Sequence, residues 1–354
     1  ANVFIDPDDG ADIFPKDFII SLTQPQHYMG AADFHDLDLF SPDPAHTLTN
    51  EEAHVRSVTR VPGDDDLDLQ AAIDMFVLTG AIKLFRENNG GSGDWRHHTM
   101  LVHESVRVAD HDILATRLRD LWQHSGYSSG PGLTRLQQLF KSDLKPVSSD
   151  RNGGSPMPKQ FDDLLLYLGS AIQMIEDGGD DEVVLVVNGN RGDQPDFDKH
   201  RVWKIIVGGA KLSRGYTIEG LTISWFRRRS KYQDTIMQMG RWFGYRPGYR
   251  DLVRLYIGRH EPYGKNRHMD LYEAFEAICR DEEAFRIELR RYMKFGGIRP
   301  GQIPPLVQNT HPELMPVARN KMWNATIKSR NFGWKWIERT LVSYESTDLA
   351  HNAR

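Results

Sequence analysis

Continuous apolar runs along the chain predict the strands of a buried parallel sheet. The run at 183–187 reads Val-Val-Leu-Val-Val without a polar interruption, which is typical of a strand covered on both faces. Similar runs at 99–103, 202–207, 221–226 and 252–257 predict four more strands. A strand with one face in water would alternate apolar and polar residues, so we expect helices on both faces of this sheet.

Between these runs, apolar residues recur every three or four positions, which predicts amphipathic helices. The clearest helix is 66–88, which follows an acidic turn and ends at a run of Asn and Gly. Further helices are expected at about 110–124, 161–175, 234–243 and 272–295. Strands that alternate with helices predict a doubly wound α/β fold, in which ligands bind at the carboxyl ends of the strands.

The remaining segments predict the division of the chain into three parts. Residues 1–62 are rich in Asp, Pro and Gly and are expected to form an irregular connector, followed by an α/β domain at 63–260 and a mostly helical extension at 261–354. The Ser-, Gly- and Pro-rich stretch 126–158 is expected to be partly mobile. The chain opens with Ala1 and an apolar, strand-like run, so we expect it to belong to a longer polypeptide.

Composition favours a globular protein of the cytoplasm. The chain has 39% hydrophobic and 26% charged residues and a single cysteine, Cys279, which suits a reducing compartment and excludes an internal disulfide. No apolar run approaches the roughly 20 residues that span a bilayer, so no membrane partner is expected.

The charge is distributed unevenly along the chain. Residues 1–200 contain 16 Lys and Arg against 34 Asp and Glu, whereas residues 201–354 contain 28 against 15. A basic half favours contact with nucleic acid, because neutralised phosphates release counterions. Two alternatives stay open: the halves neutralise each other, or the acidic half faces a basic partner.

Two segments of the basic half carry candidate chemistry. Residues 208–221 read GGAKLSRGYTIEGL directly after an expected strand, and their glycines would let the backbone approach a phosphate or a neighbouring domain. Residues 238–249 read QMGRWFGYRPGY, in which Arg241 and Arg246 could form a guanidinium pair aimed at phosphate oxygens. The alternatives are a plain glycine turn for the first segment and cation–π stacking on Trp242 and Tyr245 for the second.

Taken together, the two segments resemble motifs V and VI of superfamily 2 helicases. The resemblance implies a RecA-like fold and assigns Arg214 and Gly215 to the Arg-Gly motif between two motor domains. It assigns Gln238, Gly240 and Arg241 to the motif whose arginine finger stabilises charge on a transferring phosphoryl group.

The amino-acid sequences of both segments resemble those of the Z1 domain family of helicase-like proteins more closely still. The likeness extends over nearly the whole chain, from 2–30 through 100–105 to 302–305 and 319–322. Such proteins resemble the helicase-like ATPase subunit of bacterial restriction systems. The resemblance therefore implies DNA and a nuclease subunit as partners, in a DNA-defence setting.

Departures from the common superfamily 2 pattern leave some assignments open. Gly209-Ala210 stands where Thr-Asp is common, Thr217 stands where an Asp is common, and Arg246 lies five positions after Arg241 instead of three. We expect Arg241, with Arg246 and Gln238, to act on the nucleotide. Expected nucleotide contacts are Gly209, Arg214, Gly215, Thr217 and Gly240, and expected DNA contacts are His103, Ser105, Arg107, Ser213, Arg227, Arg228 and Arg229.

Half of an ATPase site is missing from the sequence. No Gly-x-x-x-x-Gly-Lys-Ser/Thr run occurs, and no strand ends in an Asp-Glu pair suited to Mg²⁺. We therefore expect ATP and Mg²⁺ to bind only when an N-terminal RecA-like domain of the same polypeptide is present, and no turnover by this chain alone.

Two other functions stay open. A metal-dependent endonuclease would need clustered carboxylates near a lysine, but the acidic run 64–68 is better explained as a helix start. A non-catalytic adaptor would bind DNA and dock a nuclease subunit onto it.

Overall fold

A six-stranded parallel sheet in the order β2-β8-β6-β3-β5-β4 forms the centre of the molecule. The computed structural model describes residues 22–37, 45–176, 183–187, 195–209, 217–294 and 314–315. All neighbouring strands of this sheet are parallel, and five of the six coincide with the predicted apolar runs. The strands are β2 (Val55–Val58), β3 (His98–His103), β4 (Val184–Val187), β5 (Trp203–Gly208), β6 (Leu221–Phe226) and β8 (Arg254–Gly258).

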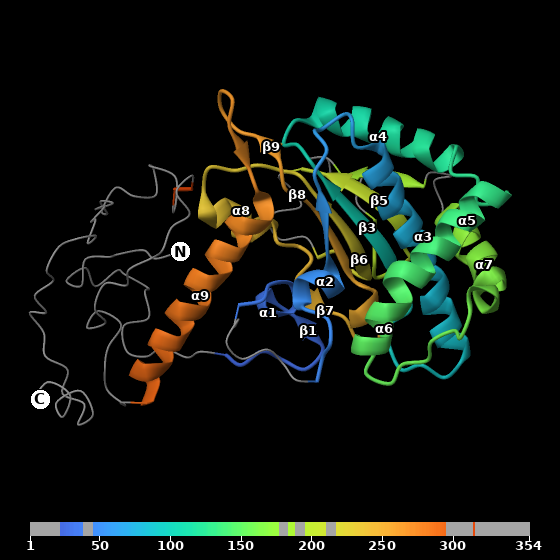
Figure 1. Cartoon of the computed structure of the whole chain (residues 1–354), viewed down its shortest axis with the longest axis horizontal. Coiled ribbons are helices and arrows are strands. Elements are labelled where there is room, and N and C mark those ends of the chain that lie inside the picture. The colour runs from blue at the N-terminus through green and yellow to red at the C-terminus, as the bar shows by residue number, and fades with distance from the viewer. Residues whose placement is uncertain are drawn as a thin grey trace, which may run out of the picture.

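Helices cover both faces of the sheet, as the unbroken apolar strands predicted (Figure 1). Met100 and Val102 of β3 belong to the main core, whereas Leu101 packs with Ile206 and Leu221 in a separate, smaller core. The helices of one side are α3 (Asp66–Asn88), α5 (Gly130–Leu139), α6 (Lys145–Arg151) and α7 (Leu165–Glu176), and those of the other side are α8 (Gln233–Met239) and α9 (Leu271–Lys294). Helix α4 (Val108–Gln123) begins after the carboxyl end of β3 and packs against α3, β4 and β5.

The region expected to be an irregular connector contributes to the folded domain. Residues 55–58 form β2, which pairs with β8 at the edge of the sheet, so the α/β domain extends to the N-terminal side of residue 63. The preceding helix, α2 (Asn50–His54), is capped by Thr49 and Glu52 in a reciprocal pair of hydrogen bonds. Further upstream lie β1 (Tyr28–Met29) and α1 (Ala31–Phe34). These elements were missed because each is five residues or shorter and carries no long periodic pattern.

Residues 126–158, expected to be partly mobile, form α5, the π-helical turn η1 (Phe140–Leu144) and α6. Their prolines lie in the first turns of α5 and α6. In α5 a proline at this position loses no helical hydrogen bond, and in α6 the proline follows the π-helical turn directly. Leu136, Phe140 and Leu144 are buried, so this segment folds as part of the core. A short 3₁₀ turn, η2 (Phe161–Leu164), leads from it into α7.

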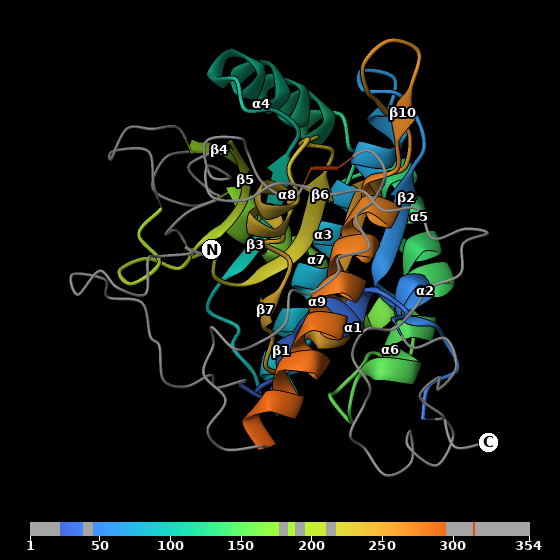
Figure 2. The ribbon, with the colours of Figure 1, turned by 90° about the vertical axis from the view of Figure 1, so that its left-hand side faces the viewer.

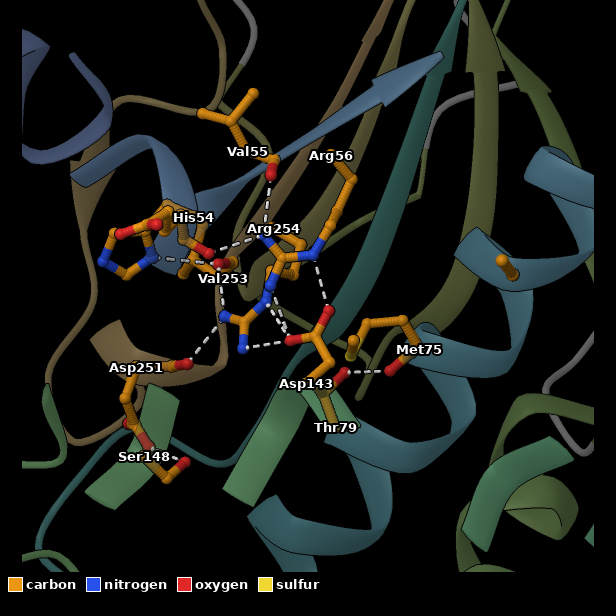
Figure 3. A network of polar contacts seen from close by, with 12 residues as sticks. His54, Val55, Arg56, Met75, Thr79, Asp143, Ser148, Asp251, Val253 and Arg254 are labelled. Atoms are coloured by element: carbon orange, nitrogen blue, oxygen red, sulfur yellow. Dashed lines mark hydrogen bonds and ion pairs between the residues drawn. The ribbon is translucent and has the colours of Figure 1, made fainter. Parts of the chain in front are cut away.

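A buried ionic network fixes the helical segment 140–151 to the sheet (Figure 3). The Asp143 carboxylate accepts hydrogen bonds from Arg56 of β2 at 2.5 and 2.6 Å and from Arg254 of β8 at 2.9 and 3.0 Å. A second pair joins Arg86 of α3 to Asp251 at 2.7 and 2.8 Å. Both pairs link a helix to β8 or to the loop that enters it.

The C-terminal extension is described up to the end of α9 and again at 314–315, and the bounds of α9 match the predicted helix within one residue. A small hairpin of β9 (Glu261–Pro262) and β10 (His268–Met269) precedes it, and the turn η5 (Arg250–Leu252) leads into β8. The stretches 302–305 and 319–322 lie outside the described residues. Among the helices that are described, none is long and apolar enough to cross a bilayer.

Candidate functional site

A cleft of about 580 Å³ opens where the two candidate motifs meet. Residues 217–220 form one wall, and residues of 237–249 form the opposite wall at the end of α8. Tyr28 of β1 and Asp94, which precedes β3, complete the lining. The cleft therefore unites segments that are far apart in the sequence, and β1 and β7 (Gly244–Tyr245) mark its place in the fold (Figure 2).

The cleft lies at the amino-terminal edge of the sheet, whereas ligand contacts were expected at the carboxyl ends of the strands. Gly220 immediately precedes β6, and its carbonyl accepts a hydrogen bond from Thr99 N at the start of β3. Helix α8 starts beyond the carboxyl end of β6 and leads back, so the loop after it returns to the edge where β8 begins. Both motifs therefore meet at the beginnings of strands.

Arg246 lies in the wall of the cleft as a buried cation. Its side chain is 5% exposed, and it donates to the backbone carbonyls of Tyr245 at 2.8 Å and Trp242 at 3.2 Å. Its Nε has no hydrogen-bond partner, and no described carboxylate forms an ion pair with it. Burial lowers the pKa of this guanidinium. A buried charge without a counter-ion is costly, and such groups are often found at functional sites.

Lys83 of α3 lies behind this wall and is fully buried. Its Nζ donates to the carbonyls of His97 at 3.1 Å and Gly220 at 3.2 Å and lies 3.7 Å from the centre of the Tyr249 ring. Burial, and next the charge of Arg246, lower the pKa of Lys83 well below its usual value. The amine thus fixes two elements of the cleft, the turn before β6 and the loop before β8.

The other predicted nucleotide residues of the second motif also line the cleft. Gln238 is exposed on the last turn of α8, and Arg241 is half-buried, with its pKa lowered by burial. A side chain at Gly240 would place its Cβ 2.8 Å from the Phe275 ring, so glycine lets α8 end against α9. Thr217 lies exposed on the facing wall.

Trp242 of this motif packs against aromatic rings of the core. The Trp242 ring lies 5.1 Å from Phe226 and 4.8 Å from Phe275, measured between ring centres. Arg246, which could have stacked on Trp242, instead donates to its backbone carbonyl. The geometry of Arg246 therefore differs from the cation–π alternative.

Gly209 lies apart from the cleft, at the carboxyl end of β5. A Cβ there would come within 2.6 Å of the His111 ring and 3.3 Å of the Ser105 carbonyl oxygen. The structure thus separates Gly209 from Thr217 and Gly240, with which it was grouped as a nucleotide contact. The positions 213–215, which include Ser213, Arg214 and Gly215, lie outside the described residues.

Three of the expected DNA contacts are buried at the carboxyl edge. Arg227 is 2% exposed and forms ion pairs with Asp65 and with Glu261, so its charge is already neutralised. Arg228 donates to His103 Nε2 at 2.9 Å. Burial, followed by the charge of Arg228, lowers the pKa of His103 to about 3, so this ring is neutral. In this arrangement the three side chains do not reach the surface, because each packs within the network beneath the edge.

The other described members of the set are accessible. Arg107 and Arg229 are exposed, and the Arg229 guanidinium donates to the carbonyl of Pro262. Ser105 donates to the Asp110 carboxylate at 2.6 Å at the start of α4, and it accepts a hydrogen bond from Arg107 N. Among the described members of the set, these three lie where a phosphate backbone could approach.

A model of the Z1 domain matches residues 68–315, which is more than half of the chain. The chain belongs to the Z1 domain family. The Z1 match includes both walls of the cleft and Lys83, but it leaves out β1, which supplies Tyr28. No curated protein and no solved structure matches the chain.

Several cleft residues of this Z1 chain were missed by sequence reasoning. Lys83 stands inside an apolar helical stretch, which is the one local signal that could have singled it out. Tyr28 belongs to the stretch 2–30, which shares the likeness to the Z1 family but was given no role in the site. Asp94 comes from a segment with no motif, and the fold brings both residues to the cleft. Within the described part of the Z1 chain, no group of three or more His, Cys, Asp or Glu residues is arranged to hold a metal ion.

Proposed function

We propose that the chain is the second motor domain and Z1 region of a helicase-like, DNA-stimulated ATPase or translocase that acts in restriction or DNA defence. In this proposal the sheet is RecA-like, and the chain supplies the arginine finger but not the P-loop. The observation that carries it is the meeting of Thr217 with Gln238, Arg241 and Arg246 in one cleft.

The proposed chemistry is electrostatic. A guanidinium that is already held in place stabilises the negative charge that grows on a transferring phosphoryl group. The two backbone carbonyls that Arg246 contacts fix its direction, while Arg241 lies next to it on the same wall. ATP and Mg²⁺ would be held mainly by the P-loop of an N-terminal RecA-like domain of the same polypeptide, which would close onto this cleft.

DNA would bind along the carboxyl edge, through Arg107 and Arg229. Both are exposed there, and Lys or Arg contacts to phosphates bind nucleic acid without regard to sequence. A nuclease subunit would be a separate partner.

The test is DNA-stimulated ATP hydrolysis by this chain, by the full-length polypeptide and by its Arg241→Ala variant. The chain alone should be inactive, and Arg241→Ala should lower kcat by something like 10³-fold. Arg286→Ala is the matched control, because Arg286 forms a part-exposed pair with Glu282 on α9 and is not among the residues that line the cleft.

The same experiment separates the other two hypotheses. Normal ATP hydrolysis by Arg241→Ala would remove the motor function from this cleft and favour a DNA-binding adaptor. Mg²⁺-dependent DNA cleavage by the chain alone would favour an endonuclease.

A further inference from the structure

Two tyrosines form an aromatic rim on the cleft. Tyr245 is 56% exposed, an unusual state for a large ring in the wall of a cleft. The half-buried Tyr28 meets it edge-on, with the ring centres 5.5 Å apart and the planes at 81°. An exposed aromatic face beside a cleft is available for stacking on a flat ligand.

The rim is held in place by the backbone. Strands β1 and β7 pair antiparallel, with Tyr28 opposite Tyr245 and Met29 opposite Gly244. Arg246 N donates to the His27 carbonyl at 2.9 Å and extends this pairing by one step. Met29 is fully buried beneath the pair. The exposed ring of Tyr245 is thus a fixed feature of the cleft.

The rim directly adjoins the buried cation. The Tyr245 carbonyl accepts a hydrogen bond from Arg246 Nη1, so the aromatic face and the guanidinium come from successive residues. Arg246 keeps an Nε–H donor without a partner among the described residues. A cleft of about 580 Å³ lies in the size range of small-molecule sites. Its chemistry fits a ligand that joins a flat ring to an anionic chain.

We propose that Tyr245, supported edge-on by Tyr28, stacks on the base of the nucleoside triphosphate whose phosphates face Arg246 and Arg241. This inference rests on the proposed function and adds the recognition of the base to it. The competing occupant of the rim is a base of single-stranded DNA, which also stacks on exposed aromatic residues.

The test uses the DNA-stimulated ATPase activity of the full-length polypeptide and the variant Tyr245→Ala. Loss of one stacked base costs about 1–3 kcal/mol, so KM for ATP should rise about 5- to 140-fold, at 1.4 kcal/mol per tenfold, with kcat nearly unchanged. Tyr245→Phe should restore KM because it keeps the ring. Inorganic tripolyphosphate, which has no base, should inhibit wild type and Tyr245→Ala equally well.

The outcomes separate this inference from the proposed function. If Tyr245→Ala leaves KM for ATP unchanged while Arg241→Ala lowers kcat, base stacking is wrong and the arginine finger stands. If Tyr245→Ala instead raises only the DNA concentration that gives half-maximal stimulation, the rim binds a DNA base and this inference is overturned. Equal weakening of ATP and tripolyphosphate would mean that the variant disturbs the loop carrying Arg246, which also contradicts a base-specific role.

Discussion

The variant Asp143→Asn should destabilise the protein strongly, because it removes the only carboxylate described between the fully buried Arg254 and the half-buried Arg56. Asp143 accepts two hydrogen bonds each from Arg56 and Arg254. Arg254 is fully buried, and its remaining bonds go to backbone carbonyls. The asparagine amide has nearly the same shape, but it carries no charge and turns an NH₂ donor toward one of the guanidinium groups. Both arginines are then left without their counter-ion.

The size of the effect follows from this burial. Removing one partner of a buried ion pair costs about 3–5 kcal/mol, and each kcal/mol lowers Tm by about 2–4 °C in a domain of 150–250 residues. We therefore expect Tm to fall by roughly 6–20 °C in thermal unfolding followed by circular dichroism. The matched control is Glu282→Gln on α9, whose partner Arg286 lies at 3.0 Å with both side chains about 40% exposed. Such a surface pair contributes about 0–1 kcal/mol.

The pH dependence provides an independent check of the same pair. Burial alone would raise the pKa of Asp143, but Arg254 and Arg56 outweigh it, so the pKa is lowered in the folded protein. The stabilisation is therefore complete above the unfolded pKa of about 4 and is lost as the pH falls below it. A Tm decrease for Asp143→Asn no larger than that for Glu282→Gln at pH 7 would refute this reasoning.

Three further predictions concern the core and the two edges of the sheet. Burial lowers the pKa of His54 and His103 to about 3 in the folded protein. Their contribution to the free energy of unfolding is therefore complete above the unfolded pKa of about 6.5 and falls by about 2 kcal/mol for each histidine at pH 5. A urea midpoint that is equal at pH 7.5 and pH 5 would contradict this. Gly220→Ala should lower Tm, because the φ angle of Gly220 is +66° and a Cβ there would overlap the backbone at the start of β3. Gly169→Ala in α7, where a Cβ meets open space, should stabilise the protein by about 0.5–1 kcal/mol. The reverse order of the two Tm values would show that the turn before β6 is unconstrained. Arg227→Met should cost about 3–5 kcal/mol, because it leaves the buried Glu261 carboxylate unpaired and leaves Asp65 with Arg117 alone. The salt dependence of DNA binding should stay unchanged, and a shallower salt slope would make Arg227 a phosphate contact.

The elements that could be predicted from the sequence are those whose pattern is long or unbroken. The run at 183–187 and the helix 66–88 agree with β4 and α3 within one residue, because β4 is an unbroken apolar run and α3 carries a long periodic apolar pattern between an acidic start and an Asn-Gly end. In contrast, β2 reads Val-Arg-Ser-Val and lies at the sheet edge, where two polar residues are tolerated. The helices of 126–158 were hidden by prolines that happen to occupy first turns.

The sequence predicted which residues of the two motifs belong to the candidate site, but it did not predict which residues from distant segments join them. From the spacing of the two motifs, Thr217, Gln238 and Arg241 were predicted to act at one nucleotide site, and all three line the cleft. Gly209 stands in the same motif, yet it lies at the other end of the strands, because a six-residue strand is about 20 Å long. Lys83 and Tyr28 approach the cleft only through the packing of α3 and the pairing of β1. Local sequence contains no information on either contact.

The most direct test of the central claim, that Arg241 reaches the transferring phosphoryl group, is a ratio of two binding constants. In the full-length polypeptide with DNA, affinity should be measured for ADP with aluminium fluoride, which imitates the phosphoryl group in transfer, and for ADP alone. An arginine finger acts on the transition state and not on the ground state, so Arg241→Ala should reduce this ratio by something like 10³-fold and leave ADP affinity nearly unchanged. An unchanged ratio would contradict the account and assign Arg241 to the structure of the loop.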